Sequence, residues 1–299
     1  MAGSFASRCC TSRTLRKPPG RPIGRGPRTT VAAMPELPEV EAARALIAER
    51  ALGREIVAVD DHDTYVCRPH APGELADALT GAQLVAARRR GKSMWCETDA
   101  GPVLGLHLGM AGRILVDDAS AGDPVRFSPL ARHPNPVWAR FRLDFADGGR
   151  LVLFDKRRLG RAVLDPDLSG LGPDALDITR DAFRARVGRG EAPLKARIMD
   201  QAVLAGVGNL LADEALWQAR LAPLRPAGDL SHPELDELRR ILRRATRRAI
   251  ARGGVHTGDV IGHRVREGSC PRCGAAMTRA TVGGRTTWWC SAEQAWPPG

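Results

Sequence analysis

The octapeptide MPELPEVE, at residues 34–41, is the most informative stretch of this chain. Apolar residues recur after it at helical spacing and Gly53 follows as a stop, which predicts a helix over Pro38–Leu52. If the chain begins at Met34 and that methionine is removed, Pro35 carries a free secondary amine. If it begins at Met1, the same nitrogen is an amide and cannot act as a nucleophile.

A free amine at this place has a specific chemical use. An α-amino group titrates at about 7.7–8.0, against about 10.4 for lysine, so much more of it is unprotonated at neutral pH. Condensed with the anomeric carbon of a sugar, a secondary amine gives an iminium that acidifies the neighbouring protons. Glu36 and Glu39 lie within one turn and can transfer protons. Alone, the octapeptide also fits an ordinary Pro-rich helix start with acidic first-turn residues.

From the octapeptide to about Asp165 the chain carries short runs of β-strand character. Residues 146–149 (Ala-Asp-Gly-Gly) are a hairpin turn between two of them. We therefore predict a sandwich or barrel of antiparallel strands led by one helix. The expected strands are Glu55–Val59, Gln83–Ala87, Met94–Glu97, Val103–Leu108, Arg113–Val116, Phe141–Phe145 and Arg150–Phe154.

The second half of the chain is helical in pattern and ends in a small Cys-bearing hairpin, Met277–Trp289. The fold class is therefore α+β. We expect a basic extension over 1–33, a β-sandwich over 34–165, a helical domain over 173–254 and a Cys-bearing module over 266–295. The expected helices are Arg180–Val187, Leu194–Leu204, Leu210–Arg220 and Ser231–Arg252.

Charge and composition favour a nucleic-acid binder but weakly. The formal net charge of +11 falls to +4 when the seven basic residues of 1–33 are left out. Residues 1–33 contain no acid and no apolar stretch typical of a secretory signal, so they suit a disordered tail, an organellar transit peptide or upstream sequence. We favour the last, with Met34 as the functional start. No membrane span is expected, and the location is cytoplasmic, or organellar if the extension is a transit peptide.

The cysteines indicate an intracellular protein with a metal site. Cys270, Cys273 and Cys290 follow the spacing C-x2-C-x16-C, which is typical of a metal site rather than a disulfide framework. Two residues separate Cys290 from Glu293, which stands where a fourth cysteine is expected, and zinc accepts carboxylate oxygen. These four side chains could therefore hold zinc, and a metal-free hairpin is the alternative. Cys67 and Cys96 lie among apolar neighbours and are expected to be inert.

Four further motifs carry cations or exposed apolar tips. They are Gly91-Lys92 after three arginines, HLGMAG at 107–112, DKRRLG at 155–160 and LAGVGN at 204–209, the last able to hold a phosphate at a helix N-terminus. The helix over Ser231–Arg252 also displays six arginines, which form either a solvated face or a phosphate-facing one.

In this order, the motifs from Met34 to about Glu293 resemble the formamidopyrimidine-DNA glycosylase / endonuclease VIII family of base-excision repair enzymes. The octapeptide is more similar to the formamidopyrimidine branch. The resemblance implies a bifunctional DNA glycosylase/AP lyase that acts as a monomer on damaged double-stranded DNA and removes oxidised bases. It also implies a helix-two-turn-helix domain and a zinc-finger-like hairpin.

The resemblance assigns a role to each motif residue. Pro35 would be the nucleophile at C1′, with Glu36 as general acid/base, Glu39 supporting it and Lys92 assisting beside the flanking phosphate. The gap left by the everted nucleotide would be filled by Met110, Arg157 and Leu159, where purine-directed relatives often have Phe at the last position. Asn209 and Arg285 would bind phosphates.

Three departures from the family pattern leave alternatives open. They are the extension before Pro35, Glu293 in place of a cysteine, and only 15 residues (255–269) between Gly254 and Cys270, shorter than in members that cap 8-oxoguanine there. With Pro35 blocked, the protein would be a silent damaged-DNA binder or an AP lyase that uses Lys92. Lys156 and Lys195 are expected to serve phosphate or surface roles.

Overall fold

The computed structural model describes Met1 and residues 34–122 and 136–296. The extension predicted over residues 1–33 therefore lies, Met1 aside, outside the described residues. Within them, no helix has the length and apolar character needed to span a bilayer.

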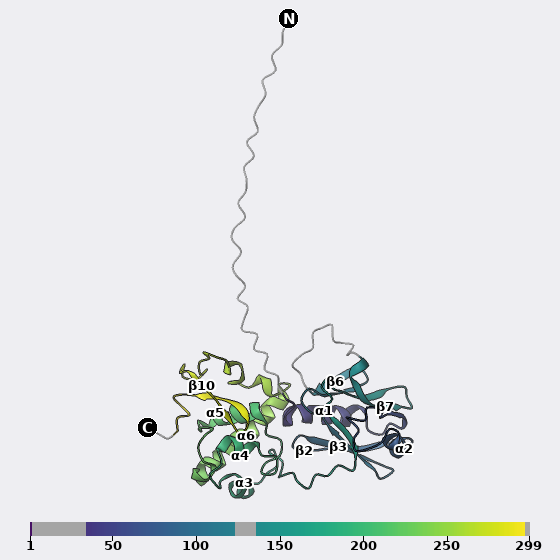
Figure 1. Cartoon of the computed structure of the whole chain (residues 1–299), viewed down its shortest axis with the longest axis horizontal. Coiled ribbons are helices and arrows are strands. Elements are labelled where there is room, and N and C mark those ends of the chain that lie inside the picture. The colour runs from purple at the N-terminus through teal and green to yellow at the C-terminus, as the bar shows by residue number, and fades with distance from the viewer. Residues whose placement is uncertain (2–33, 123–135, 297–299) are drawn as a thin grey trace. The chain divides into compact units, whose positions relative to one another are not determined.

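The first half of the described chain is a pair of antiparallel sheets that share one apolar core (Figure 1). One sheet has the order β1-β7-β8-β5-β6 and the other β2-β3-β4-β9. The strands are β1 (Ile56–Asp60), β2 (Leu84–Arg90), β3 (Ser93–Thr98), β4 (Val103–His107), β5 (Arg113–Val116), β6 (Ala119–Gly122), β7 (Ala139–Phe145), β8 (Arg150–Phe154) and β9 (Arg161–Leu164).

Alternation of side chains explains these strands. In β3, Met94, Cys96 and Thr98 are buried and the residues between them are partly exposed, as expected of a strand with one face on a core. The β7–β8 hairpin closes where Phe145 N donates to Gly149 O at 2.8 Å, across the turn predicted at residues 146–149.

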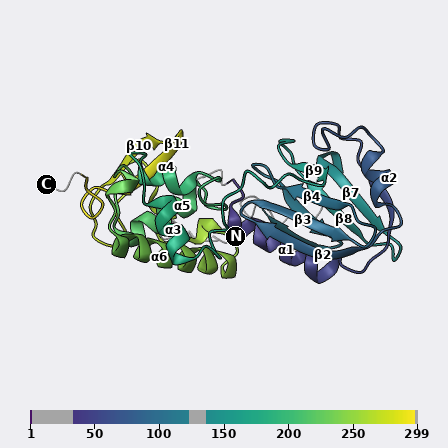
Figure 2. The ribbon, with the colours of Figure 1, turned by 90° about the horizontal axis from the view of Figure 1, so that it is seen from below.

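Helix α1 (Leu37–Arg50) covers one open edge of the sandwich. It packs against β2 of one sheet and β5 and β6 of the other (Figure 2). Because β2 and β6 are edge strands, the helix shields them from further pairing. Val40, Ala43 and Ile47 enter the sandwich core, whereas Leu37 belongs to the core of the second half. The start of α1 is thus shared by both halves.

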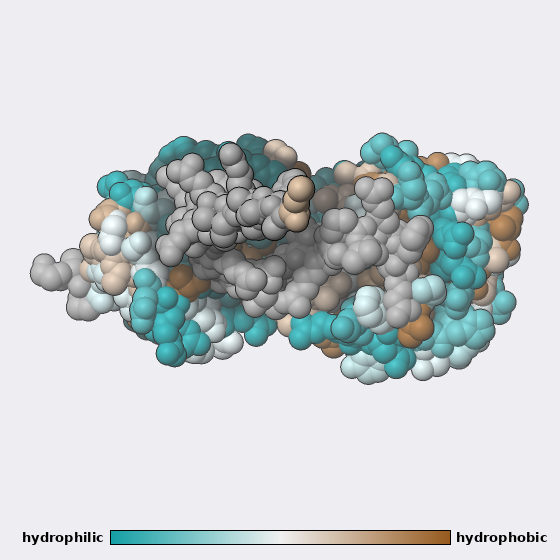
Figure 3. All heavy atoms as spheres, turned by 90° about the horizontal axis from the view of Figure 1, so that it is seen from above, coloured by the Kyte–Doolittle hydropathy of each residue, from teal (hydrophilic) through white to brown (hydrophobic). Residues whose placement is uncertain are grey.

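The second half is a helical core followed by a two-stranded hairpin, β10 (Met277–Val282) and β11 (Arg285–Cys290). On the face drawn in Figure 3, hydrophilic residues predominate among the coloured atoms, and hydrophobic ones form separate spots. The helices of the described chain, after α1, are α2 (Glu74–Leu79), α3 (Arg180–Val187), α4 (Leu194–Met199), α5 (Asn209–Ala219) and α6 (His232–Ala251), with 3₁₀ turns η2 (Pro136–Trp138), η3 (Ala227–Asp229), η4 (Val255–Thr257) and η5 (Ile261–His263).

The predicted α+β class is confirmed, and every predicted strand and helix is found within a few residues of its expected bounds, with one exception. The helix predicted over Leu194–Leu204 is wrong in length, since α4 ends at Met199 and the backbone of Asp200 is extended. Strands β6 and β9 and helix α2 were not predicted. The domain boundaries stay predictions.

Candidate active site

The carboxyl group of Glu36, next to Pro35, is held at the N-terminus of α5. Glu36 is 1% exposed, and its carboxylate oxygens accept the backbone N–H groups of Gly208 (3.1 Å), Leu210 (2.8 Å) and Leu211 (3.0 Å). Burial raises the pKa of this carboxyl, against the opposing effects of Lys92 and these N–H groups. A buried carboxyl with a raised pKa can hold and deliver a proton.

Gly208 makes this arrangement possible. A Cβ at position 208 would overlap the carboxyl carbon of Glu36. Leu37 N also donates to Gly206 O at 3.2 Å, so the start of α1 is bound directly to the turn before α5. The glycines of the 204–209 motif therefore make room for the Glu36 carboxylate, just before α1, at the N-terminus of α5. A phosphate is the other anion that such a helix N-terminus could hold.

Glu39 is a second buried carboxyl at the same place. One oxygen accepts the backbone N–H of Glu36 at 3.0 Å, and the other accepts that of Val255 at 2.7 Å. Burial first, and then the charge of Glu36, raise the pKa of Glu39 to about 7. Glu39 thus fixes both the backbone of its neighbour and the segment that follows α6.

Lys92 shares the electrostatic environment of these carboxyls. It lies in the turn between β2 and β3, and burial lowers the pKa of its ammonium group. The charges of Glu36 and Glu39 raise it, and that of Arg285 lowers it further. The structure therefore brings Glu36, Glu39, Lys92 and Arg285 within electrostatic reach of one another.

The predicted gap-filling residues come together on two packed loops. The Arg157 guanidinium lies 3.9 Å from Met110 Sδ, and the Leu159 side chain is 37% exposed. Gly109, at φ +58°, lies so close to the backbone of Leu159 and Gly160 that a Cβ there would overlap it. An exposed apolar side chain on such a tip is suited to insertion rather than core packing.

Asp155, which the sequence motif contains but to which no role was assigned, organises this tip. Its carboxylate is buried and accepts the N–H groups of Arg157 (2.9 Å), Leu159 (2.6 Å) and Gly160 (2.6 Å). Its backbone oxygen accepts the guanidinium of Arg140 at 2.8 Å. The loop that carries Arg157 and Leu159 is therefore preformed.

Asn209, the first residue of α5, is positioned by a buried lysine. Lys195 Nζ donates to Asn209 Oδ1 at 2.6 Å and to Thr287 Oγ1 of β11 at 2.8 Å, and it lies 2.7 Å from Asp213 Oδ1. Of the phosphate or surface roles expected for Lys195, a surface role is wrong, since its side chain is 0% exposed. Burial lowers the pKa of Lys195, while Asp213 opposes this shift.

The same network extends to the hairpin. Arg264 donates to Asp213 Oδ2 at 2.8 Å and to Thr286 O at 3.1 Å, and Trp288 N donates to Asp213 Oδ2 at 3.2 Å. Arg285, exposed at the start of β11, is thereby tied to the helix that carries Asn209. No sequence signal pointed to this network, because its members are far apart in the chain.

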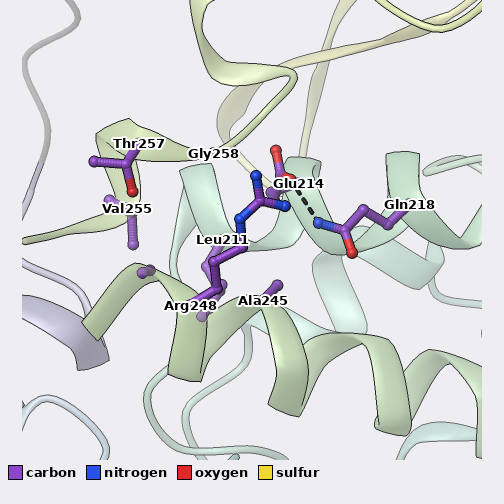
Figure 4. A pocket seen from close by; sticks show the side chains of 9 residues that line it. Leu211, Glu214, Gln218, Ala245, Arg248, Val255, Thr257 and Gly258 are labelled. Carbon is purple, nitrogen blue, oxygen red and sulfur yellow. Dashed lines mark hydrogen bonds between the residues drawn. The ribbon is translucent and has the colours of Figure 1, made fainter. Parts of the chain in front are cut away.

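The segment after α6 is fastened at two points. Val255 N donates to Glu39, as above, and Val260 N donates to Glu214 of α5 at 3.0 Å. Glu214 also accepts Gln218 Nε2 at 2.6 Å and lines a small pocket between α5, α6 and η4 (Figure 4). The pocket contains none of the predicted catalytic residues.

Several arginines of α6 are engaged within the protein. Arg248 pairs with Asp259, Arg240 pairs with Glu237, and Arg239 donates to Ile178 O at 2.7 Å. Because these guanidiniums already have partners, the structure favours a solvated face over a phosphate-facing one for these three.

Cys270, Cys273, Cys290 and Glu293 form a candidate metal site. One ligand atom from each lies within 4.8 Å of the others, and the sulfurs of Cys273 and Cys290 are 3.4 Å apart. The Glu293 carboxylate also accepts Arg272 at 2.9 Å. Burial opposes ionisation of Cys270, but hydrogen bonds from Trp217 and the backbone outweigh it and lower its pKa to about 7. Cys67 and Cys96 are buried, as expected.

Comparison with known proteins agrees with this geometry. The formamidopyrimidine-DNA glycosylase N-terminal domain matches residues 34–162, and the H2TH domain of the same glycosylase matches residues 170–260. Formamidopyrimidine-DNA glycosylases of Chloroflexus aggregans and Roseiflexus sp. are 34% and 38% identical, over 86% of this chain and 97% and 98% of theirs.

A solved structure extends the comparison to three dimensions. Lactococcus lactis Fpg in complex with DNA that contains an oxidized pyrimidine is 26% identical and superposes with a TM-score of 0.73, over 87% of this chain and 99% of that one. The fold and the site define the class as a DNA-repair glycosylase. The chain belongs to the formamidopyrimidine-DNA glycosylase family.

Proposed function

We propose that this protein removes oxidised bases from duplex DNA and then cleaves the strand at the abasic site, with Pro35 nitrogen as nucleophile. The observation that carries this proposal is the carboxyl of Glu36, buried beside Pro35 and fixed by three backbone N–H groups. The functional chain would begin at Pro35, after removal of Met34 and of whatever precedes it. The family match also begins at residue 34.

The first step exchanges one bond at the sugar for another. The Pro35 amine forms a bond to C1′ as the glycosidic bond breaks, and the base leaves with the proton that the amine loses. Glu36 would then supply a proton to the ring oxygen O4′ as the C1′–O4′ bond breaks, and the nitrogen lone pair completes an iminium at C1′ of the opened sugar.

The later steps cleave the strand. The iminium acidifies C2′–H, whose loss expels the 3′ phosphate, and a second elimination expels the 5′ phosphate. Hydrolysis then returns the amine. Lys92 would assist the proton transfers from its place between the Glu36, Glu39 and Arg285 charges.

The remaining predicted residues would bind and distort DNA. Met110, Arg157 and Leu159 would occupy the gap left by the everted nucleotide, whose extrusion costs a few kcal/mol. Asn209 and Arg285 would hold phosphates, and the Lys195–Thr287 contacts support a fixed spacing between them.

Borohydride trapping tests the nucleophile. Chains starting at Met34 and at Met1 would each be incubated with duplexes that contain 8-oxoguanine, dihydrouracil or an abasic site. Borohydride would reduce the protein–DNA imine, and mass spectrometry would map the adduct. An adduct on Pro35 from the Met34 chain is expected. Binding without any adduct would instead favour the silent damaged-DNA binder, and an adduct on Lys92 the lysine-dependent lyase.

We also infer that Cys270, Cys273, Cys290 and Glu293 hold a structural Zn²⁺. The mutual distances of the four donors and their chemistry support this. Elemental analysis should find one zinc per chain, and a chelator should lower the Tm. Glu293→Cys should retain zinc at least as tightly, whereas Glu293→Gln should weaken it. A purified protein without zinc and with a chelator-insensitive Tm would refute the assignment.

A further inference from the structure

A cluster of arginines surrounds the single tyrosine of the chain, outside the predicted site. The Tyr65 side chain is 44% exposed, in the segment between β1 and α2. Its ring has the guanidinium carbons of Arg68, Arg158 and Arg161 at 3.9, 5.6 and 5.4 Å from its centroid. All three lie within cation–π range of a ring that remains open to solvent. We refer to these four residues as the Tyr65 patch.

The patch is fixed from beneath by one carboxylate. Asp63 accepts Arg158 Nη2 at 2.6 Å and also accepts the backbone N–H groups of Tyr65 (3.2 Å) and Val66 (3.1 Å). The Asp63 side chain is only 10% exposed. Its charge is therefore shared between Arg158 and Arg140, whose Nη1 lies 3.5 Å from Asp63 Oδ2, and its oxygens also fix the loop.

Arg68 and Arg161 pair with no carboxylate of the described residues. Across residues 34–122 and 136–296, neither forms an ion pair with a carboxylate; each instead donates to a nearby carbonyl, of Tyr65 and Gly160 respectively. Two unneutralised cations held against one aromatic ring repel each other, and an anion placed between them would relieve that repulsion.

The chain places this patch beside the gap-filling loop. Arg158 belongs to the same loop as Arg157 and Leu159, Arg161 begins β9 directly after it, and Ala162 N donates to Val66 O at 3.1 Å. A duplex whose gap is filled by Arg157 and Leu159 must continue past this turn. Each strand of a duplex carries one phosphate per ~3.4 Å of helix axis, so its backbone offers the anions that Arg68 and Arg161 lack.

We propose that the Tyr65 patch is a second DNA-binding surface, which holds the sugar–phosphate backbone of the duplex beyond the everted nucleotide. Arg68 and Arg161 bind phosphates, and the Tyr65 ring packs on the sugar or base next to them. The surface is independent of sequence, like the other phosphate contacts. The proposal rests on the DNA-glycosylase function proposed above.

The test is binding to a duplex with a tetrahydrofuran abasic analogue, over a range of KCl concentrations. Arg68→Ala/Arg161→Ala should reduce the slope of log K against log [salt] by about 1.8, since each phosphate contact contributes about 0.9. Tyr65→Ala should raise the Kd about fivefold or more, and Tyr65→Phe should not. Arg180→Ala/Arg189→Ala, which removes two exposed arginines, one at the start of α3 and one just after its end, is the control and should leave the slope nearly unchanged.

A second measurement locates the contact. Duplexes shortened one base pair at a time from either end should lose affinity for the wild type when one particular end is shortened, and the double variant should no longer respond to that end. Unchanged salt slopes and the same length dependence in folded variants would overturn the proposal while leaving the glycosylase intact. A wild type that binds no DNA would overturn both.

Discussion

The site at Glu36 and the loop tip at Asp155 share one structural arrangement but differ in the role that it serves. In each, a buried carboxylate accepts three backbone N–H groups and so fixes a turn of the chain. At Glu36 the N–H groups come from residues more than 170 positions away, and Lys92 acts on the charge. At Asp155 they come from its own loop, and the side chains that this loop carries point outward.

The difference shows where chemistry is to be sought. A carboxylate whose N–H donors belong to its own loop fixes the shape of that loop. A carboxylate whose donors belong to a distant element is instead held where two elements meet, close to other charged groups. Substitutions of the two carboxylates should therefore impair activity in different ways.

Glu36→Gln should have the largest effect. The amide keeps the shape of the carboxyl but cannot supply a proton, so the single-turnover rate of base excision should fall by about 10²–10⁴. Affinity for the tetrahydrofuran duplex should change little. Glu49→Gln, at an exposed position near the other end of α1, is the control. An unchanged rate would remove Glu36 from the mechanism.

Lys195→Met should destabilise the fold more than any surface lysine change. Removing one member of a buried ion pair costs about 3–5 kcal/mol, and here Asp213 and Asn209 both lose a partner. Urea unfolding gives the measurement. Lys156→Met, at an exposed lysine, should fall within about 0.5 kcal/mol of the wild type. Equal losses in the two variants would contradict the buried network.

Stability should decrease as pH rises through the range set by Glu39. The folded state keeps the Glu39 proton up to a pH of about 7, whereas the ordinary value is 4.5, so the folded state binds more protons in between. The free energy of unfolding should therefore fall by about 3 kcal/mol between pH 4.5 and 7.5 through this group. The difference between wild type and Glu39→Gln, measured by denaturant unfolding at each pH, should show this slope; a flat difference would exclude it.

Asp155→Asn should have the smallest effect and a selective one. The weaker acceptor loosens the tip, so excision from duplex lesions should slow about tenfold, the scale of one hydrogen bond to a charged group. Cleavage of a single-stranded abasic oligonucleotide, where no gap must be filled, should keep its rate. Asp167→Asn, in an exposed turn, is the control. Equal slowing on both substrates would place Asp155 in the chemistry instead.

Most of the fold could be read from local patterns. The β7–β8 hairpin was predicted because its strands alternate and its turn is rich in glycine. Strand β6, with the sequence ASAG, has no β-forming side chains and exists only because β5 pairs with it. Helix α4 ends just before Asp200, whose side chain accepts Ala202 N at 2.9 Å and so forms a local turn that competes with the helix.

The site divides in the same way. The motif residues could be found because each lies in a short recognisable segment, and the structure gathers Glu36, Glu39 and Lys92. The burial of Lys195 could not be predicted, because no neighbouring residue in the sequence indicates a buried partner for its charge. Its partners, Asp213 and Thr287, are 18 and 92 positions away and come together only in the folded chain.

The contact between Glu36 and the N-terminus of α5 has a consequence for dissecting the protein. If the chain were cut between β9 and α3 and the pieces expressed separately, the first piece would carry Glu36 without its three N–H donors, and the second those donors without their acceptor. Neither fragment would contain a finished catalytic group. Activity would return only when the fragments associate, so the turnover rate would measure their association.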